Sequence, residues 1–377
     1  MKILYHHRIA SKDGQYVHVE EIITALKDNG HEIVMVAPKV AENSDFGSDG
    51  GFVDTLKSKI PQFLYELLEF SYAFWAFLKL CVAIIKYKPD AIYERYNLFL
   101  PAGIWAKKLF NLPFLLEVNA PIYEERKKYD GISIDWLAKW SQHYAWKNAD
   151  MILPVTNVLA DYARKVGVPE SRISIIPNGI NHKRFSNNTK VPKSYIKGDA
   201  IVIGFVGFVR EWHGIDKVID LIASLGNIDV KLLIVGDGPI RSELEEQAKL
   251  AGLSDKFFIT GVVARNDMSE WLNIIDIALQ PDVTSYASPL KMLEYMAKGK
   301  AIVAPDTQNI KELLQHEVNA LLFSLQDAES FLTAIKTLCL DDKLRDDLGR
   351  NALLSVETEE LTWNANAIRI VNLFKSI

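Results

Sequence analysis

Short apolar runs alternate with amphipathic segments along almost the whole chain. The first run, at 2–5, precedes a segment at 16–28 whose apolar positions recur at helical spacing, and a second apolar run follows at 32–38. Short apolar runs bounded by turn residues indicate buried strands, whereas spacings of three and four residues indicate a helix. A strand, a helix and a second strand in this order predict a parallel βαβ unit.

The same alternation begins again after a polar stretch at 187–198, where we place a domain boundary. Strands are predicted before it at 90–93, 114–118, 151–155 and 173–177, and after it at 201–207, 231–239, 257–261, 274–279 and 301–304. Two α/β halves predict two doubly wound, Rossmann-like domains facing a cleft, at 1–186 and 196–360. The amphipathic segment 361–377 is expected to cross back onto the first domain.

The segment 62–87 is strongly apolar and aromatic, and three interpretations of it are open. We favour a helix buried between the sheet and its neighbours. A second interpretation is a helix partly exposed as a membrane-surface patch, with Lys57, Lys59, Lys86 and Lys88 as flanking cations. A membrane span is the weakest, because the densest apolar part is short for a span and Lys79 interrupts it.

Composition describes a well-packed protein of about two domains. The chain has 377 residues, of which 49% are hydrophobic and 24% charged, and this balance excludes extensive disorder. The net charge of −5 argues against a general nucleic-acid binder. Cys81 and Cys339 form neither a disulfide framework nor a metal motif. Because the N-terminal apolar run is too short for a signal peptide, we expect a cytoplasmic protein.

The segment 288–300 carries its own helix start and stop signals. Ser288 suits the cap, Pro289 the first helical position and Gly299 the terminator. Lys291 is unusual, since a cation in the first turn opposes the helix dipole unless both face a bound anion. We therefore predict that this helix N-terminus and Lys291 hold a phosphate, with Glu294 one turn on. The alternative is a surface helix with a Glu294–Lys298 pair.

Five blocks follow one another along the chain: Gly30–Val34, Pro177–Asn181 with Phe185, Gly204–Gly207 with Arg210, Val235–Pro239, and Ser288–Gly299. Taken in this order, they resemble the retaining nucleotide-sugar glycosyltransferases with the GT-B fold, known as glycosyltransferase group 1 or family four. Three further segments are similar to bacterial enzymes of exopolysaccharide or lipopolysaccharide assembly: Lys12–Gly14, Tyr93–Arg95 and Glu117–Pro121.

The resemblance implies a UDP- or GDP-sugar donor in the C-terminal domain and an acceptor, lipid-linked or polysaccharide, against the N-terminal domain. It implies transfer with retention, no metal ion and no tightly bound cofactor. It also implies a cytoplasmic enzyme with peripheral contact at the inner face of the membrane, and no nucleic-acid partner. Pro177 to Gly179 would form the hinge side of the cleft.

The family uses a basic pair to neutralise the leaving diphosphate where its charge develops. Arg210 matches the family's arginine, whereas His213 stands where lysine is usual, so we expect Lys291 to take over. Glu294 matches the second glutamate of a paired motif that holds the donor ribose. The first glutamate is replaced by Ala287, for which Asp282 or a backbone amide near Ser288 could substitute.

The resemblance thus assigns two sets of residues. The donor-binding set is Gly14, Gly207, Arg210, His213, Gly236, Asp237, Ser288, Pro289, Leu290, Lys291 and Glu294, and the catalytic set is Arg210, Lys291, Glu294, Asn119 and Glu117. Asn119 stands where the family has a histidine. Glu117, Glu94 and Glu124 are candidates for an acceptor-side base, although each could equally be a structural carboxylate that pairs with Arg95 or Arg126.

Other interpretations remain open from the sequence. The fold could host a nucleotide-sugar epimerase, or a non-catalytic member that binds sugars or partners, as Ala287 and Asn119 would allow. A nicotinamide oxidoreductase is disfavoured because the glycine fingerprint is missing. We expect His18 to be a satisfied structural histidine and Trp212 to be a packing residue.

Overall fold

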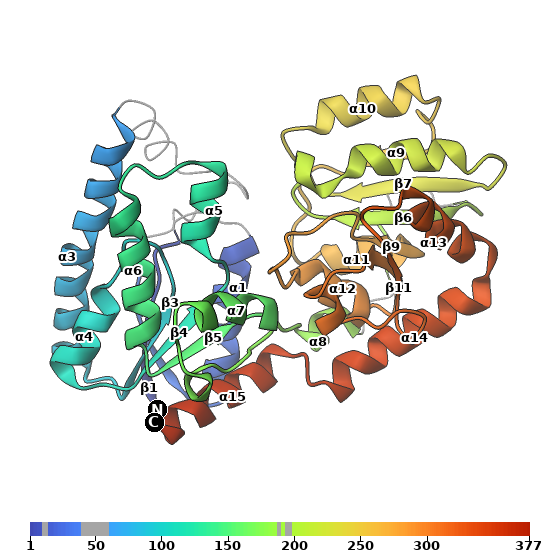
Figure 1. Cartoon of the computed structure of the whole chain (residues 1–377). Helices are drawn as coiled ribbons and strands as arrows, with labels where there is room; N and C mark the ends of the chain where they lie inside the picture. Colours follow the sequence, from blue (N-terminus) through green and yellow to red (C-terminus); the bar gives the residue numbers. More distant parts are fainter. Residues whose placement is uncertain (10–13, 39–59, 187–189, 193–197) are drawn as a thin grey trace. The chain divides into compact units, whose positions relative to one another are not determined.

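The chain forms two compact units (Figure 1). A computed structural model describes residues 1–9, 14–38, 60–186, 190–192 and 198–377. Unit 1 comprises Met1–Pro177 and Trp363–Ile377, and unit 2 comprises Asn178–Thr362. The predicted boundary at 187–198 lies mostly outside the described residues, and the chain passes between the units at Pro177 and Asn178, nearer the N-terminus than expected.

Unit 1 contains a parallel five-stranded sheet in the order β2-β1-β3-β4-β5. Its strands are β1 (Lys2–His6), β2 (Glu32–Val36), β3 (Ala91–Arg95), β4 (Phe114–Val118) and β5 (Met151–Pro154). Its helices are α1 (Gly14–Asp28), α3 (Gln62–Tyr87), α4 (Ala102–Phe110), α5 (Ile122–Tyr129), α6 (Asp135–Asn148), α7 (Asn157–Lys165) and α15 (Trp363–Ser376). The parallel order places the carboxyl ends of β1, β3 and β4 at one edge.

The strand predicted at 173–177 is wrong. Ile173 forms one isolated bridge with Ile152, and the amides of Ser174 and Ile176 donate to carbonyls of β5. The carbonyl partner of Ile176 is that of Pro154, which has no N–H with which to continue a ladder. The segment therefore runs beside β5 without becoming a strand.

Unit 2 contains a parallel six-stranded sheet in the order β11-β10-β9-β6-β7-β8. Its strands are β6 (Ile201–Val206), β7 (Val230–Val235), β8 (Phe257–Ile259), β9 (Ile277–Leu279), β10 (Ala301–Pro305) and β11 (Leu321–Phe323). Its α-helices are α8 (His182–Ser186), α9 (Ile215–Ser224), α10 (Arg241–Leu250), α11 (Met268–Ile274), α12 (Leu290–Ala297), α13 (Ala328–Leu340) and α14 (Asp342–Thr358). The short edge strand β11 was not predicted.

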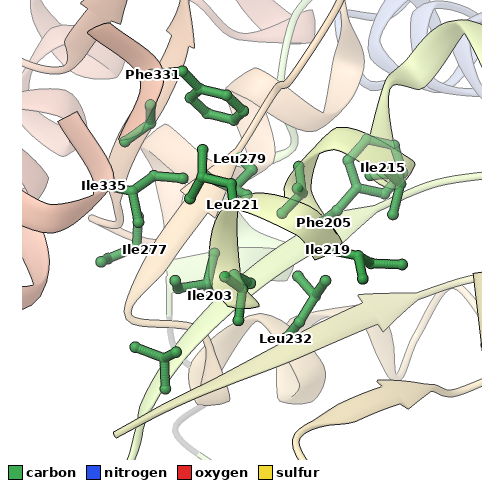
Figure 2. Packing of buried hydrophobic residues seen from close by; sticks show 14 of the residues in the cluster. Ile203, Phe205, Ile215, Ile219, Leu221, Leu232, Ile277, Leu279, Phe331 and Ile335 are labelled. Atoms are coloured by element: carbon green, nitrogen blue, oxygen red, sulfur yellow. The ribbon is translucent and has the colours of Figure 1, made fainter. Parts of the chain in front are cut away.

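Alternate residues of the unit 2 strands enter two separate cores. Ile203, Phe205, Leu232, Ile277 and Leu279 pack with Ile219 of α9 and Ile335 of α13 on one face (Figure 2). The intervening strand residues, among them Val202 and Leu233, pack on the other face with Met292 and Leu293 of α12. Burial on both faces explains why these strands are apolar throughout rather than alternating.

The last helix returns to unit 1, as predicted. Helix α15 packs against α1, and the Asn366 side chain donates to the Pro177 carbonyl at 2.7 Å. Trp363 meets the His18 ring edge-on, with centroids 4.8 Å apart. Unit 1 is therefore built from both ends of the chain, while unit 2 is a continuous segment between them.

Helix α3 corrects our preferred interpretation of segment 62–87. It is a helix, but its large apolar side chains are mostly exposed rather than buried. By length and composition it is the one helix among the described residues that could cross a membrane. Lys57 and Lys59 lie outside the described residues. The pattern predicted the helix, but not which of its faces meets the sheet.

Helix α12 begins one residue later than predicted. Pro289 is the cap residue and makes no side-chain cap, and the Ser288 hydroxyl is buried without a hydrogen bond to a described residue. Gly299 has φ +59° and ends the helix, as predicted. Tyr295 falls at helical spacing on the polar side with Lys291 and Lys298, yet it is fully buried, and its hydroxyl accepts a hydrogen bond from the Val206 amide at 2.8 Å.

Candidate functional site

The loops after β6 and β7 lie backbone against backbone at the carboxyl edge of the unit 2 sheet. Gly207 and Gly236 have φ values of +140° and +146°, and a Cβ on Gly236 would overlap the Gly207 carbonyl oxygen. The Val209 amide donates to the Asp237 carbonyl at 2.7 Å. Glycine at 207 and 236 therefore allows a close approach between the two loops, in addition to forming turns.

Lys291 extends from the first turn of α12 toward this loop pair. Its ammonium lies 3.8 Å from the centroid of the Phe205 ring and 3.0 Å from where a Cβ of Gly207 would stand. Within the described residues, no side-chain or backbone oxygen accepts a hydrogen bond from it. Burial lowers the pKa of Lys291 to about 7, although nearby Glu294 favours its charged form. An anion arriving here would meet a cation that no oxygen of the described residues already holds.

Arg210 lies in the loop that follows β6. Its guanidinium stands over the rings of Phe208 and Trp212, 5.1 and 5.0 Å from their centroids. Trp212 itself is 57% exposed, and its ring packs against Arg210 and His213 rather than in a hydrophobic core. Stacking on two aromatic rings orients the guanidinium. Its five N–H groups point outward in the plane of the guanidinium, where they can donate to a ligand.

His213 is neutral at pH 7. Burial, and then the charges of Lys291 and Arg210, lower the pKa of His213 to about 3. Its Nδ1 accepts a hydrogen bond from the Arg210 amide at 3.2 Å, so its Nε2 carries the proton. His213 packs on the same Phe205 ring as Lys291, with ring centroids 5.1 Å apart. A neutral His213 can donate a hydrogen bond from Nε2 but adds no cation.

In the loop before α12, and at Asn309 after β10, buried polar atoms lack a partner among the described residues. Among the described residues, none donates to Gln280 Oε1 or Asn309 Oδ1, and the Ser288 hydroxyl is likewise unmatched. The Asn309 amide nitrogen holds the carbonyl of Ala287 at 2.7 Å. Asp282, the expected substitute for the missing glutamate, accepts from the Val283 amide and shapes its own turn.

The remaining residues of the predicted donor-binding set lie in different parts of the structure. Asp237 accepts from the Gly238 amide at 2.8 Å and pairs with Arg241 at 3.5 Å, so its contacts shape the β7–α10 turn. Pro289 and Leu290 open α12, and Glu294 lies one turn along it. Gly14 belongs to unit 1, where it begins α1. Lys12 and Asp13 lie outside the described residues.

Glu117 in unit 1 is surrounded by donors. Its carboxylate accepts from Arg95 at 2.5 Å, Tyr93 at 2.7 Å and Asn119 at 2.5 Å, and it pairs with His18 at 3.1 Å. Burial alone would raise the pKa of Glu117, but His18 and Arg95 hold it well below the usual range. A carboxylate so stabilised is a weak base, which favours the structural alternative for Glu117.

The other acceptor-side candidates are also engaged. Glu94 is buried and its carboxylate lies 2.5 Å from Nδ1 of His6. Glu124 accepts from Gln142 at 2.9 Å. Arg126 pairs with Glu69 of α3 rather than with Glu124. His18 is a satisfied structural histidine, as predicted.

The structure thus brings Lys291 and His213 onto the Phe205 ring, with Arg210 beside His213, and places Glu117 and Asn119 in a separate network of unit 1. Sequence reasoning missed Phe205, Phe208 and Asn309, because nothing in an apolar run or a lone amide distinguishes a site residue from a core residue. In the described part of the chain, no group of three or more His, Cys, Asp or Glu side chains is placed to hold a metal ion.

Two family models match consecutive parts of the chain. The model for Glycosyltransferase Family 4 matches residues 12–184, and the model for Glycosyl transferases group 1 matches residues 186–354. The chain belongs to this glycosyltransferase family. The family resemblance inferred from the five sequence blocks is confirmed.

Individual relatives are distant. The chain is 21% identical to alpha-D-kanosaminyltransferase of Streptomyces kanamyceticus over 65% of its length, and it spans 66% of that protein. It is 22% identical to a GDP-mannose-dependent alpha-mannosyltransferase of Corynebacterium glutamicum, covering 95% of this chain and 84% of that protein. The structure of Anabaena HepE in complex with UDP aligns over 100% of both chains with TM-score 0.75 at 18% identity. This likeness shows the fold, two parallel-sheet α/β domains of GT-B type.

Proposed function

We propose that this glycosyltransferase moves a sugar, with retention and without a metal ion, from a UDP- or GDP-sugar to a lipid-linked or polysaccharide acceptor in bacterial glycan biosynthesis. The observation that carries the proposal is the Lys291 ammonium, partly buried at a helix N-terminus with no acceptor among the described residues. The UDP complex of Anabaena HepE and the GDP-mannose-dependent mannosyltransferase of Corynebacterium glutamicum support this class of donor.

The donor diphosphate would lie at the N-terminus of α12. The first N–H groups of a helix have no partner within it and favour an anion, and Lys291 adds positive charge there when it is protonated. Arg210 and the Nε2–H of His213 would supply further donors. Glu294, one turn on, would accept hydrogen bonds from the ribose hydroxyls. Range 196–360 is thus proposed as the donor domain and 1–186 as the acceptor domain.

In the proposed reaction the bond between the sugar's anomeric carbon and the diphosphate oxygen breaks. Arg210 and Lys291 would stabilise the negative charge that collects on the leaving diphosphate. The acceptor hydroxyl would attack from the same face and pass its proton to a departing phosphate oxygen. Glu117 is unsuited as the base here, because four donors already stabilise its charge, and we propose that it and Asn119 order the edge of unit 1.

Lys291→Ala tests the proposal. We expect turnover with the correct donor to fall at least tenfold, since the variant lacks the cation that neutralises the leaving group, while the fold persists. Circular dichroism and the melting temperature would verify folding. Lys300→Ala, a lysine just beyond the same helix, is the matched control and should retain turnover. Wild-type turnover in Lys291→Ala would remove the basis of the assignment.

A panel of nucleoside diphosphates would identify the donor base. Any ligand that binds the native state raises its apparent stability, by about 2.7 kcal/mol at one hundred times its Kd. We expect either UDP or GDP to raise the melting temperature of the wild-type protein, and to do so less in Lys291→Ala. Stabilisation by neither would indicate a non-catalytic member, whereas donor conversion without acceptor would indicate an epimerase.

A further inference from the structure

Helix α3 places its large apolar side chains outward and its small ones inward. Those that face the interior of unit 1 are mainly alanines: Ala73, Ala76 and Ala83, with Leu80 and Ile84. The outward residues include Phe74, Leu78, Val82 and Ile85, which are 57%, 61%, 64% and 67% exposed. An ordinary amphipathic helix of a globular protein has the opposite arrangement.

The exposed residues form one continuous stripe. Leu67, Phe74, Leu78, Val82 and Ile85 recur at intervals of three, four or seven residues, so they share a face. From Phe63 to Ile85 this face extends for about 33 Å along the helix axis. We call it the α3 face. Its length exceeds the scattered apolar exposure that a monomer's surface ordinarily shows.

The two carboxylates of α3 are turned into unit 1. Glu66 is fully buried and accepts from the amides of Ser133 and Ile134 at 2.8 and 2.7 Å. Glu69 pairs with Arg8 at 3.0 Å and with Arg126 at 2.9 Å. The ionic side chains of α3 that remain outside are therefore cations, Lys79 and Lys86.

The cations and aromatic rings border the α3 face. Lys79 lies over the Trp75 ring, 3.4 Å from its centroid, and Lys86 lies over Tyr87. Helix α6 lies beside α3 (Figure 1) and adds Trp140, whose ring lies 6.1 Å from that of Phe70, and Trp136, which is 72% exposed. Tryptophan, tyrosine and lysine around an apolar centre are typical of residues at a lipid–water boundary.

Positive charge is concentrated in unit 1, the unit that contains α3. Unit 1 holds 23 Lys and Arg against 21 Asp and Glu, whereas unit 2 holds 20 against 27. Unit 1 is thus net positive in a chain whose formal charge is −5. An anionic surface would be attracted to the unit that carries the α3 face.

We propose that the α3 face docks on the surface of an anionic lipid bilayer, with the helix lying in the interface. A bilayer supplies both an apolar phase for the stripe and negative headgroups for Lys79 and Lys86. A second copy of the chain fits less well, because a symmetric contact would bring the lysines of both copies to one face. Spanning is excluded by the contacts of α3 with α4 and β2, and by the bonds of Glu66 and Glu69 within unit 1.

Vesicle co-sedimentation of the full chain tests the inference without donor or acceptor, so its outcome is independent of the proposed reaction. The probes are vesicles of phosphatidylglycerol and phosphatidylcholine in equal parts, and vesicles of phosphatidylcholine alone. We expect binding to the anionic vesicles that weakens as salt is added. Leu78→Glu with Val82→Glu should lower the partition coefficient at least tenfold, and Lys79→Gln with Lys86→Gln should lower it by about fivefold per lysine.

Leu250→Glu is the matched control, because Leu250 ends helix α10 of unit 2 and is 80% exposed. It adds one carboxylate, where the Leu78→Glu/Val82→Glu variant adds two, at an exposed leucine outside the α3 face, and it should bind vesicles like the wild type. Equal binding by the Leu78→Glu/Val82→Glu variant would overturn the proposal. So would a wild-type dimer, measured by light scattering, that fails to bind vesicles and becomes monomeric in that variant. Retained melting temperature in each variant verifies that α3 still folds.

Discussion

At the scale of single residues, the site depends on the protonation states of the two titratable side chains beside Phe205. Lys291 and His213 pack on the same ring, and both are held toward their neutral forms by burial. His213 is neutral well before pH 7, whereas Lys291 is divided between its two forms there. Of these two groups, Lys291 is therefore the one that titrates near pH 7.

The affinity for a nucleoside diphosphate should depend on pH through Lys291. Its free-state pKa of about 7 means that the ammonium is lost as pH rises from 7 to 9, and the anion loses its main cation. We expect Kd for the diphosphate to increase with pH over this range, by at most about tenfold per pH unit. Titration calorimetry at several pH values would measure this.

The variant Lys291→Met is the control for this pH dependence of diphosphate affinity. It keeps an unbranched side chain but no titrating group, so it should bind more weakly and with little change between pH 7 and 9. A wild-type affinity that is constant or rises over this range would show that Lys291 remains charged throughout.

Gly236 is the residue most sensitive to a single methyl group in the loop pair. Gly236→Ala combines φ +146° with an overlap of its Cβ on the Gly207 carbonyl oxygen. We expect it to lower the free energy of unfolding by about 2–4 kcal/mol. Gly226→Ala, at φ +65° with nothing within 4 Å, should cost about 1 kcal/mol. Equal losses in urea denaturation would mean that the loops can separate.

At the scale of elements, α3 and α12 show why periodicity is incomplete evidence. In both helices the pattern predicted a helix at the observed place. In α12 the hydroxyl of Tyr295 found the Val206 amide, so a residue assigned to the polar side is buried. In α3 the alanine side meets α4 and β2, since small residues allow close helix packing, and the larger side chains face outward.

Glu117 also shows that local sequence is incomplete evidence. It lies at the carboxyl end of β4, a place where ligands commonly bind in parallel sheets. Its neighbours Arg95, Tyr93 and His18 come from β3 and α1, far away in the sequence, and they convert a candidate base into a stabilised anion. The sequence allowed both roles, and the contacts favour the second.

At the scale of the whole molecule, the chain leaves unit 1 at Pro177 and re-enters it at Trp363. Helix α15 thus completes a unit whose other elements precede it by almost two hundred residues. Its buried side chains cover α1, so the stability of unit 1 should depend on the last residues of the chain.

Phe374→Ala tests this dependence, because the ring is 4% exposed within unit 1. We expect the free energy of unfolding to fall by about 3–5 kcal/mol, the usual cost of removing a buried phenylalanine. Asn364→Ala, on the same helix, removes only an exposed hydrogen bond to Asn29 and should change stability by about 0.5 kcal/mol. Similar small effects in both variants would mean that α15 is not part of the core.

The sequence by itself determined the alternation of strands and helices, the two α/β halves, the returning last helix and the order of the blocks that indicate the family. These features depend on local periods, caps and glycines, which short segments of chain encode. Tertiary structure decided that residues 173–177 form no strand, that α3 faces outward, and that Lys291 and His213 share Phe205. Each of these depends on a partner from another segment, such as Pro154 for residues 173–177, strand β2 for α3, or Phe205 for Lys291, and no local period specifies that partner.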